Sequence, residues 1–257
     1  MQFTKEKVDK GVVEREFDIE VSGERVPAVI WAPQDASGPR PLVLMGHGGS
    51  QHKKTPGIRA RANIYARELG YAVAAIDAPG HGDRISRDEA ERLSQEVGAR
   101  VRGQGPGGGM DEARLKAMAE RTRQAVPEWA ATLDALQSLA YVGEGPVGYW
   151  GVSMGTAIGV PFVADEPRIR CAVFGLAGLR PGAREFEAAA KRIEIPIEFA
   201  FQRTDPVAPL EHGLTLFDAF GSKEKSMHIN PGGHLEIPRY EGDSWQRFYE
   251  RHLGRGN

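Results

Sequence analysis

A serine, an aspartate and a histidine follow one another along the chain in settings that suit nucleophilic catalysis. Ser153 stands in the segment Gly151–Gly155, which reads Gly-Val-Ser-Met-Gly between an apolar run and a stretch of small residues. This pattern predicts a strand, a sharp turn and a helix, with the serine at the apex of the turn. Only small flanking residues let the strand and the helix approach closely enough. We therefore interpret Ser153 as a nucleophile exposed at the edge of a sheet.

A serine hydroxyl becomes a good nucleophile when a neighbouring base takes its proton and an acidic group holds that base. Asp205 follows the apolar run 195–201, just beyond the C-terminal end of a predicted strand. His234 follows the last predicted strand, residues 226–230, through a Pro-Gly-Gly segment. We predict that His234 is the base and Asp205 its acidic partner. The alternative is that Asp205 merely caps the following helix and His234 is a turn residue.

Other acidic residues and histidines fit these two roles less well. The strand that begins at Cys171 is followed by no carboxylate before Glu185. Asp218 lies inside an apparent helix and is expected to be solvated. His228 alternates within a predicted strand and His252 lies on the C-terminal helix, so both are expected to be structural.

Acyl transfer also needs hydrogen-bond donors for the negative charge that develops on the carbonyl oxygen. The N–H group of Met154, at the start of the helix after the serine, is one candidate. The glycine-rich segment 46–50, which follows the first core strand, is expected to supply another. Gly49 is the first choice there and Gly48 the second. The alternative is that this segment is a plain turn.

Three further side chains are candidates for contact with a substrate: His47, His81 and Trp150. We expect His47 mainly to order the glycine-rich segment and His81 to shape the loop that begins at Asp77. Lys53 and Lys54 are expected to be solvated.

The spacing of apolar residues predicts an α/β fold around these positions. Phe17, Ile19 and Val21 alternate with polar residues, and the pattern repeats from Val26 to Ile30, which predicts an N-terminal antiparallel hairpin. Continuous apolar runs are typical of strands buried on both faces, and they occur at 41–45, 71–76, 147–150, 171–177 and 195–201. Helical patterns alternate with these strands, so we expect a mostly parallel sheet with helices on both faces.

Residues 84–126 interrupt this alternation. Two amphipathic helical patterns lie there, one marked by Ala90, Leu93, Val97 and Val101 and the other by Leu115, Met118 and Ala119, before Pro127. The glycine-rich segment 103–109 separates them. We predict a two-helix cap with a glycine hinge, inserted at about 84–126 into a single domain of residues 1–257. The glycines formally satisfy GxGxxG, but no strand precedes them, so we expect no nucleotide site.

The segments His47–Gly49, Asp77–Gly82 and Gly151–Gly155, followed by Asp205 and His234, together resemble the α/β-hydrolase superfamily. The resemblance covers residues 12–253 and is greatest to serine carboxylesterases of the dienelactone-hydrolase-like and prolyl-oligopeptidase-like branch. It implies a hydrolase that cleaves carboxylic esters of small molecules through an acyl-enzyme, without a cofactor. Dienelactone hydrolases carry a cysteine where this chain has a serine, so their particular activity is not implied.

Several other functions use the same three residues and remain open from the sequence: amidase or peptidase, thioesterase, lactonase and carbon–carbon cleavage. Epoxide or haloalkane hydrolysis would need a carboxylate at position 153. From a different class of protein, a ligand receptor on a hydrolase fold would retain these residues without efficient turnover.

Composition restricts the partners and the compartment. The 257 residues carry a formal charge of -2, which argues against a nucleic-acid or anionic-membrane surface. The N-terminus is polar, and no apolar run approaches the roughly 18 residues of a membrane span. A single cysteine, Cys171, excludes an internal disulfide and favours a cytoplasmic location. No group of histidine, cysteine and acidic residues shows metal-ligand spacing, so we predict no metal and expect a small-molecule partner, with a homodimer left open.

Overall fold

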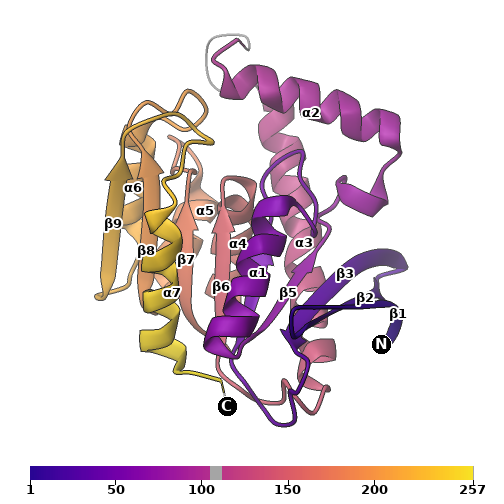
Figure 1. The fold of residues 1–257 in the computed structure, drawn as a ribbon. Helices are drawn as coiled ribbons and strands as arrows, with labels where there is room; N and C mark the ends of the chain where they lie inside the picture. The colour runs from indigo at the N-terminus through magenta and orange to yellow at the C-terminus, as the bar shows by residue number, and fades with distance from the viewer. Residues whose placement is uncertain (105–111, 257) are drawn as a thin grey trace.

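A mixed sheet organises the chain in the computed structural model, which describes residues 1–104 and 112–256. Its strands are β1 (Gln2–Asp9), β2 (Val12–Val21), β3 (Glu24–Pro33), β4 (Leu42–Gly46), β5 (Ala72–Ile76), β6 (Val147–Val152), β7 (Ile169–Gly175), β8 (Ile197–Gln202) and β9 (Lys225–Asn230). They lie in the order β1-β2-β3-β5-β4-β6-β7-β8-β9 (Figure 1). Strands β1, β2, β3 and β5 pair antiparallel, and the pairs from β5 to β9 are parallel. The predicted α/β fold and its N-terminal antiparallel hairpin are confirmed.

Strand β1 was not predicted. Its side chains are almost all exposed, because it pairs with β2 at the outer edge of the sheet and covers little of the core. A strand that is solvated on both faces shows no alternation of apolar and polar residues, so the signal on which strand prediction depends is missing.

Helices cover both faces of the sheet. One face is covered by α1 (Pro56–Ile64), which continues into a π-helical turn (Tyr65–Leu69), and by α7 (Tyr240–Leu253). The other is covered by α3 (Glu112–Gln137), α4 (Met154–Asp165), α5 (Arg184–Arg192) and α6 (Leu210–Ala219). Continuous apolar strands are therefore sandwiched between two hydrophobic layers, as expected for parallel strands. Among the described residues, no helix combines the length and the apolar character needed to cross a membrane.

Of the two predicted cap helices, the second differs from the structure. Helix α2 (Arg87–Val101) begins at Ser86, which forms a capping box with Glu89, and it lies across one end of the sheet (Figure 1). Helix α3 does not stop before Pro127 but continues through it to Gln137, so the expected break there is wrong. Ala125 and Trp129, on either side of the proline, are buried in the core, and this packing offsets the cost of a helix-interior proline. Of the predicted glycine hinge, residues 105–109 lie outside the described residues.

Two glycines allow α4 to approach the sheet closely. A Cβ atom on Gly155 would lie 2.4 Å from the carbonyl oxygen of Gly46, at the end of β4. A Cβ atom on Gly151 would lie 2.7 Å from the backbone of Gly155. Both distances are shorter than any normal contact, so the small residues around Ser153 are a steric requirement of the strand–turn–helix unit.

We predict that Gly155→Ala destabilises the protein by about 1–3 kcal/mol, because the added methyl group forces α4 away from β4. Gly57→Ala is the matched control, since a Cβ atom at this helical glycine would meet nothing within 4 Å. Urea denaturation gives both free energies of unfolding. Equal stability of the two variants would show that the close approach has no energetic consequence.

Candidate active site

Ser153 occupies a strained turn between β6 and α4. Its backbone has φ 57° and ψ -116°, a conformation that costs a non-glycine residue about 1–3 kcal/mol. The Ser153 N–H group donates to the Gly175 carbonyl on the neighbouring strand β7 (2.8 Å). The Thr156 hydroxyl lies within hydrogen-bond distance of the carbonyl oxygens of both Gly151 (2.7 Å) and Gly175 (2.6 Å). These contacts fix the turn to β7 and hold the serine side chain at the end of the sheet.

The structure brings together the three residues that the sequence predicted as a catalytic group. The Ser153 Oγ atom lies 2.9 Å from Nε2 of His234, and Nδ1 of His234 lies 2.6 Å from Oδ2 of Asp205. Because the ionised carboxylate can only accept, Nδ1 carries the proton and Nε2 is free to accept from the serine. Oδ1 of Asp205 accepts from the N–H groups of Val207 (2.8 Å) and Ala208 (3.0 Å). One carboxylate oxygen therefore binds the loop that precedes α6, and the histidine occupies the other; Asp205 does not cap α6, whose N-cap residue is Pro209.

The loop that carries His234 is held at the end of the sheet by backbone hydrogen bonds. After β8, the N–H group of Arg203 donates to the carbonyl oxygen of Asn230, the last residue of β9 (2.8 Å), and that of Thr204 donates to the carbonyl oxygen of Gly232 (3.1 Å). Gly232 has φ 111°, which a residue with a side chain rarely adopts. These bonds fix the aspartate and histidine loops relative to each other.

Two of the three predicted oxyanion donors are free in the described structure. The Met154 amide stands at the first turn of α4, where helix N–H groups have no partner within the helix. The Gly48 N–H group donates to Oε1 of Gln51 (3.1 Å), so it is already engaged, and Gly48 is a poor donor candidate. Within the described part of the chain, no acceptor pairs with the Gly49 N–H group. Gly49 therefore remains the better candidate.

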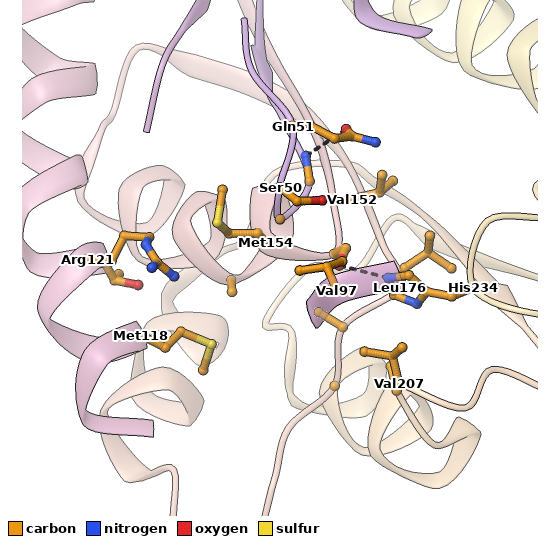
Figure 2. Close-up of a pocket in the computed structure, with 18 of the residues that line it drawn as sticks. Ser50, Gln51, Val97, Met118, Arg121, Val152, Met154, Leu176, Val207 and His234 are labelled. Atoms are coloured by element: carbon orange, nitrogen blue, oxygen red, sulfur yellow. Dashed lines mark hydrogen bonds between the residues drawn. The ribbon is translucent and has the colours of Figure 1, made fainter. Parts of the chain in front are cut away.

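A cleft of about 2760 Å³ opens at this end of the sheet and includes Ser153, Met154, Gly49 and His234 in its wall. Figure 2 shows the side chains that face it from several elements. Val97 of α2, Met118 and Arg121 of α3, Ser50 and Gln51 after β4, and Val207 and His234 on the late loops all border it. In the sequence, only their helical spacing had drawn attention to Val97 and Met118, and nothing there indicated that they border a cleft.

The three candidates for substrate contact are placed differently from one another. His81 and Trp150 line the cleft, although only 1% and 5% of their surfaces are exposed. His47 is 2% exposed and is not among the residues that line the cleft. Its Nδ1–H group donates to the Gly48 carbonyl (2.8 Å), and its Nε2 accepts from the Ala78 N–H group (3.0 Å). His47 thus ties the glycine-rich segment to the loop after β5, as a residue that orders this segment would.

Comparison with solved structures shows the family to which the chain belongs. A cold-adapted esterase from an Arctic intertidal metagenomic library, in a complex with polyethylene glycol, is 33% identical, with 98% of this chain and 100% of that chain covered and a TM-score of 0.80. The chain belongs to the α/β-hydrolase esterases. An acetyl xylan esterase from Paenibacillus sp. R4 is 16% identical (98% of this chain, 88% of that chain, TM-score 0.70), and a dienelactone hydrolase from Anabaena variabilis is 18% identical (95% and 99%, TM-score 0.65); both share the fold. No protein-family model matches the sequence, and no curated protein matches it significantly.

A buried ion pair beside the site of this α/β-hydrolase was missed by the sequence analysis. Lys53 was expected to be solvated, but its side chain is 3% exposed, and Nζ donates to Oδ2 of Asp77 (2.7 Å) and Oδ2 of Asp83 (2.6 Å). Asp77, which is fully buried, also accepts from the N–H groups of Lys53 (2.8 Å) and Asp83 (2.9 Å). The hydrogen bond from Lys53 lowers the pKa of Asp83. The lysine and two aspartates link the glycine-rich segment to the loop after β5.

We predict that Lys53→Met destabilises the protein by about 3–5 kcal/mol, because it leaves the buried Asp77 carboxylate without its cation. Lys54→Met is the adjacent control, and its more exposed ion pairs with Glu14 and Glu16 contribute about 1 kcal/mol or less. Both values come from chemical denaturation. A loss at Lys53 no larger than that at Lys54 would refute the importance of the buried pair.

We predict that the free energy of unfolding depends on pH because His47 is buried. Burial lowers the pKa of its imidazole from 6.5 to about 4, so the folded protein keeps the ring neutral where the unfolded chain binds a proton. Between those pH values the unfolded state holds more protons, and the free energy of unfolding must fall as pH falls, by up to about 3 kcal/mol from this residue. His47→Gln should flatten the fall, whereas His52→Gln, at an exposed position, should leave it unchanged. Denaturation curves between pH 7 and pH 4 measure this, and identical slopes in all three proteins would exclude His47 as the cause.

Proposed function

We propose that this α/β-hydrolase cleaves carboxylic esters of small molecules, with Ser153 as nucleophile, His234 as general base and acid, and Asp205 as the group that holds the imidazole. The observation that carries the proposal is the position of His234, whose two ring nitrogens are hydrogen-bonded to Ser153 and to Asp205 at the same time. The 33% identical esterase, which covers nearly the whole chain, supports ester hydrolysis.

In the first half of the proposed reaction the serine is acylated. Nε2 of His234 accepts the proton of the Ser153 hydroxyl as Oγ attacks the ester carbonyl carbon. Asp205 stabilises the imidazolium that forms and keeps Nδ1 protonated. The imidazolium then gives its Nε2 proton to the departing alcohol oxygen, the ester C–O bond breaks, and the acyl group stays on Oγ.

In the second half a water molecule releases the acyl group. Nε2 of His234 takes a proton from the water, the resulting hydroxide attacks the acyl carbon, and the bond to Oγ breaks as Ser153 recovers its proton. In both halves a negative charge develops on the carbonyl oxygen, and the N–H groups of Met154 and Gly49 are the proposed donors to it. Each such donor contributes on the order of 10² to 10³ in rate in well-studied hydrolases.

The proposed small-molecule ester binds in the cleft, against the end of the sheet where Ser153 lies. Its walls come from the cap helices as well as from the loops that carry the three catalytic residues. We infer that α2 and the first turns of α3 form a cap over a single hydrolase domain, and that the acyl group lies beneath it. None of the proposed steps requires a cofactor.

Ser153→Ala should abolish hydrolysis of an activated aryl ester and labelling by a fluorophosphonate probe, because both need Oγ as nucleophile. Ser94→Ala is the control, since Ser94 lines the same cleft but lies on α2. Circular dichroism checks that both variants fold. A Ser153→Ala variant that still labels fully would overturn the proposal. Matched ester and amide substrates, compared in kcat/KM, separate the esterase from an amidase with the same three residues.

Asp205→Asn should lower kcat by about 10³- to 10⁴-fold and leave the fold intact, because an amide stabilises the wrong imidazole tautomer and cannot balance the imidazolium charge. Asp218→Asn, at an exposed position on α6, should keep full activity. Steady-state kinetics with the same aryl ester decide the matter. Activity of Asp205→Asn within tenfold of the unsubstituted enzyme would mean that Asp205 does not hold the base.

A further inference from the structure

A second group of titratable side chains meets on the face of the sheet that α7 covers. Glu198 of β8, His228 of β9 and Glu241 of α7 each offer one ligand atom, and these atoms all lie within 4.8 Å of one another. Nδ1 of His228 lies 2.8 Å from Oε2 of Glu241 and 3.8 Å from Oε1 of Glu198. The three residues are far apart along the chain, so their spacing gave no metal-ligand signal in the sequence.

Both carboxylates are deeply buried, and one of their oxygens lacks a partner. Glu198 is 5% exposed and Glu241 is 1% exposed. Oε1 of Glu198, which faces the imidazole, is buried without a hydrogen-bond donor among the described residues, although Ser244 hydrogen-bonds to the carboxylate. A buried acceptor without a partner is costly, and a buried charge is tolerated only when it is paired or coordinates a metal.

Two buried carboxylates face one imidazole, which can offset the charge of only one ionised carboxylate. Burial disfavours the ionised form of Glu198 and raises its pKa. Arg247 also attracts Glu198, but it is exposed to solvent, where its field is screened. A divalent cation bound to both carboxylates and to a neutral imidazole would make the charges equal.

The donor set and its surroundings suit a transition-metal ion. Carboxylate oxygen and imidazole nitrogen bind Zn²⁺ at about 2.0–2.2 Å, which puts neighbouring ligand atoms about 3.4 Å apart in a tetrahedral site. The separations of 2.8 and 3.8 Å at His228 bracket this value. Oε1 of Glu241 accepts from the Asn230 amide (2.8 Å), and the Tyr240 hydroxyl donates to that amide's oxygen (2.8 Å). Such outer hydrogen bonds orient metal-binding carboxylates.

We propose that Glu198, His228 and Glu241 bind a divalent transition-metal cation such as Zn²⁺ or Mn²⁺, with water in the remaining positions. The His228 side chain is 35% exposed and gives the cation an entry path from solvent. Binding displaces the proton shared by His228 and Glu241. Because His228 precedes and Glu241 follows the loop that carries His234, the cation fixes both ends of that loop. Its role is structural, since the three residues lie outside the Ser153–His234–Asp205 group.

The test is metal binding by the chelator-treated 257-residue protein, measured by titration calorimetry and by thermal unfolding with ZnCl₂ or MnCl₂. We expect one cation per chain at micromolar concentration and a rise in Tm of about 5–10 °C at a hundredfold excess over Kd. Glu198→Gln and His228→Ala should lose this binding at least tenfold. The control Glu224→Gln changes an exposed carboxylate that pairs with another histidine, His252, and should bind like the unsubstituted protein.

Ser153→Ala should also bind the cation unchanged, so failure of the proposed esterase reaction and failure of this site are distinguishable. Because Glu198→Gln preserves the shape of the side chain, circular dichroism should show it folded even if His228→Ala is not. No binding by the unsubstituted protein at micromolar metal would overturn the proposal, and so would equal binding by Glu198→Gln.

Discussion

The strained backbone at Ser153, with its positive φ of 57°, is the constraint on which the rest of the site depends. The turn stores about 1–3 kcal/mol of strain, and it persists because neighbouring groups over-determine it. Thr156 and the Ser153 amide fix the turn to β7, while Gly151 and Gly155 let α4 pass within contact distance of β4. Relaxation of the turn would carry the serine away from His234, so the packing of one strand–helix unit sets the position of the proposed nucleophile.

The rest of the site depends on loops that are fixed by polar contacts rather than by the core. His47, with its burial-lowered pKa, links the glycine-rich segment to the loop after β5 through two hydrogen bonds. The buried Lys53–Asp77 pair makes a second link between the same two segments. Arg84 binds Glu128 of α3 through two hydrogen bonds (2.7 and 2.9 Å) and joins that loop to the helix beside the cleft. Rigid loops would keep the proposed oxyanion donors in place without the need to reorganise during reaction.

Sequence patterns predicted the parts of this structure that follow from local sterics and burial. Strands buried on both faces and the turn at Ser153 were visible because each has a short-range signature. Asp205 and His234 were visible because each follows a predicted strand. Features that depend on residues distant in sequence were not. Lys53 resembles any surface lysine until Asp77 is placed beside it, the continuity of α3 through Pro127 depends on packing on both sides of the proline, and β1 has no apolar face to reveal it. The cluster of Glu198, His228 and Glu241 escaped for the same reason.

The proposed mechanism predicts the geometry of the adduct that the enzyme forms with a fluorophosphonate. A crystal structure of the enzyme inactivated by a fluorophosphonate would locate the phosphorus atom and the oxygen that stands in for the oxyanion. In the expected adduct the phosphorus is bonded to Oγ of Ser153. The phosphonyl oxygen that stands in for the oxyanion lies within about 3 Å of the N–H groups of Met154 and Gly49, and Nε2 of His234 lies beside the leaving-group position. An adduct on another residue, or an oxygen directed away from both amides, would be incompatible with the mechanism.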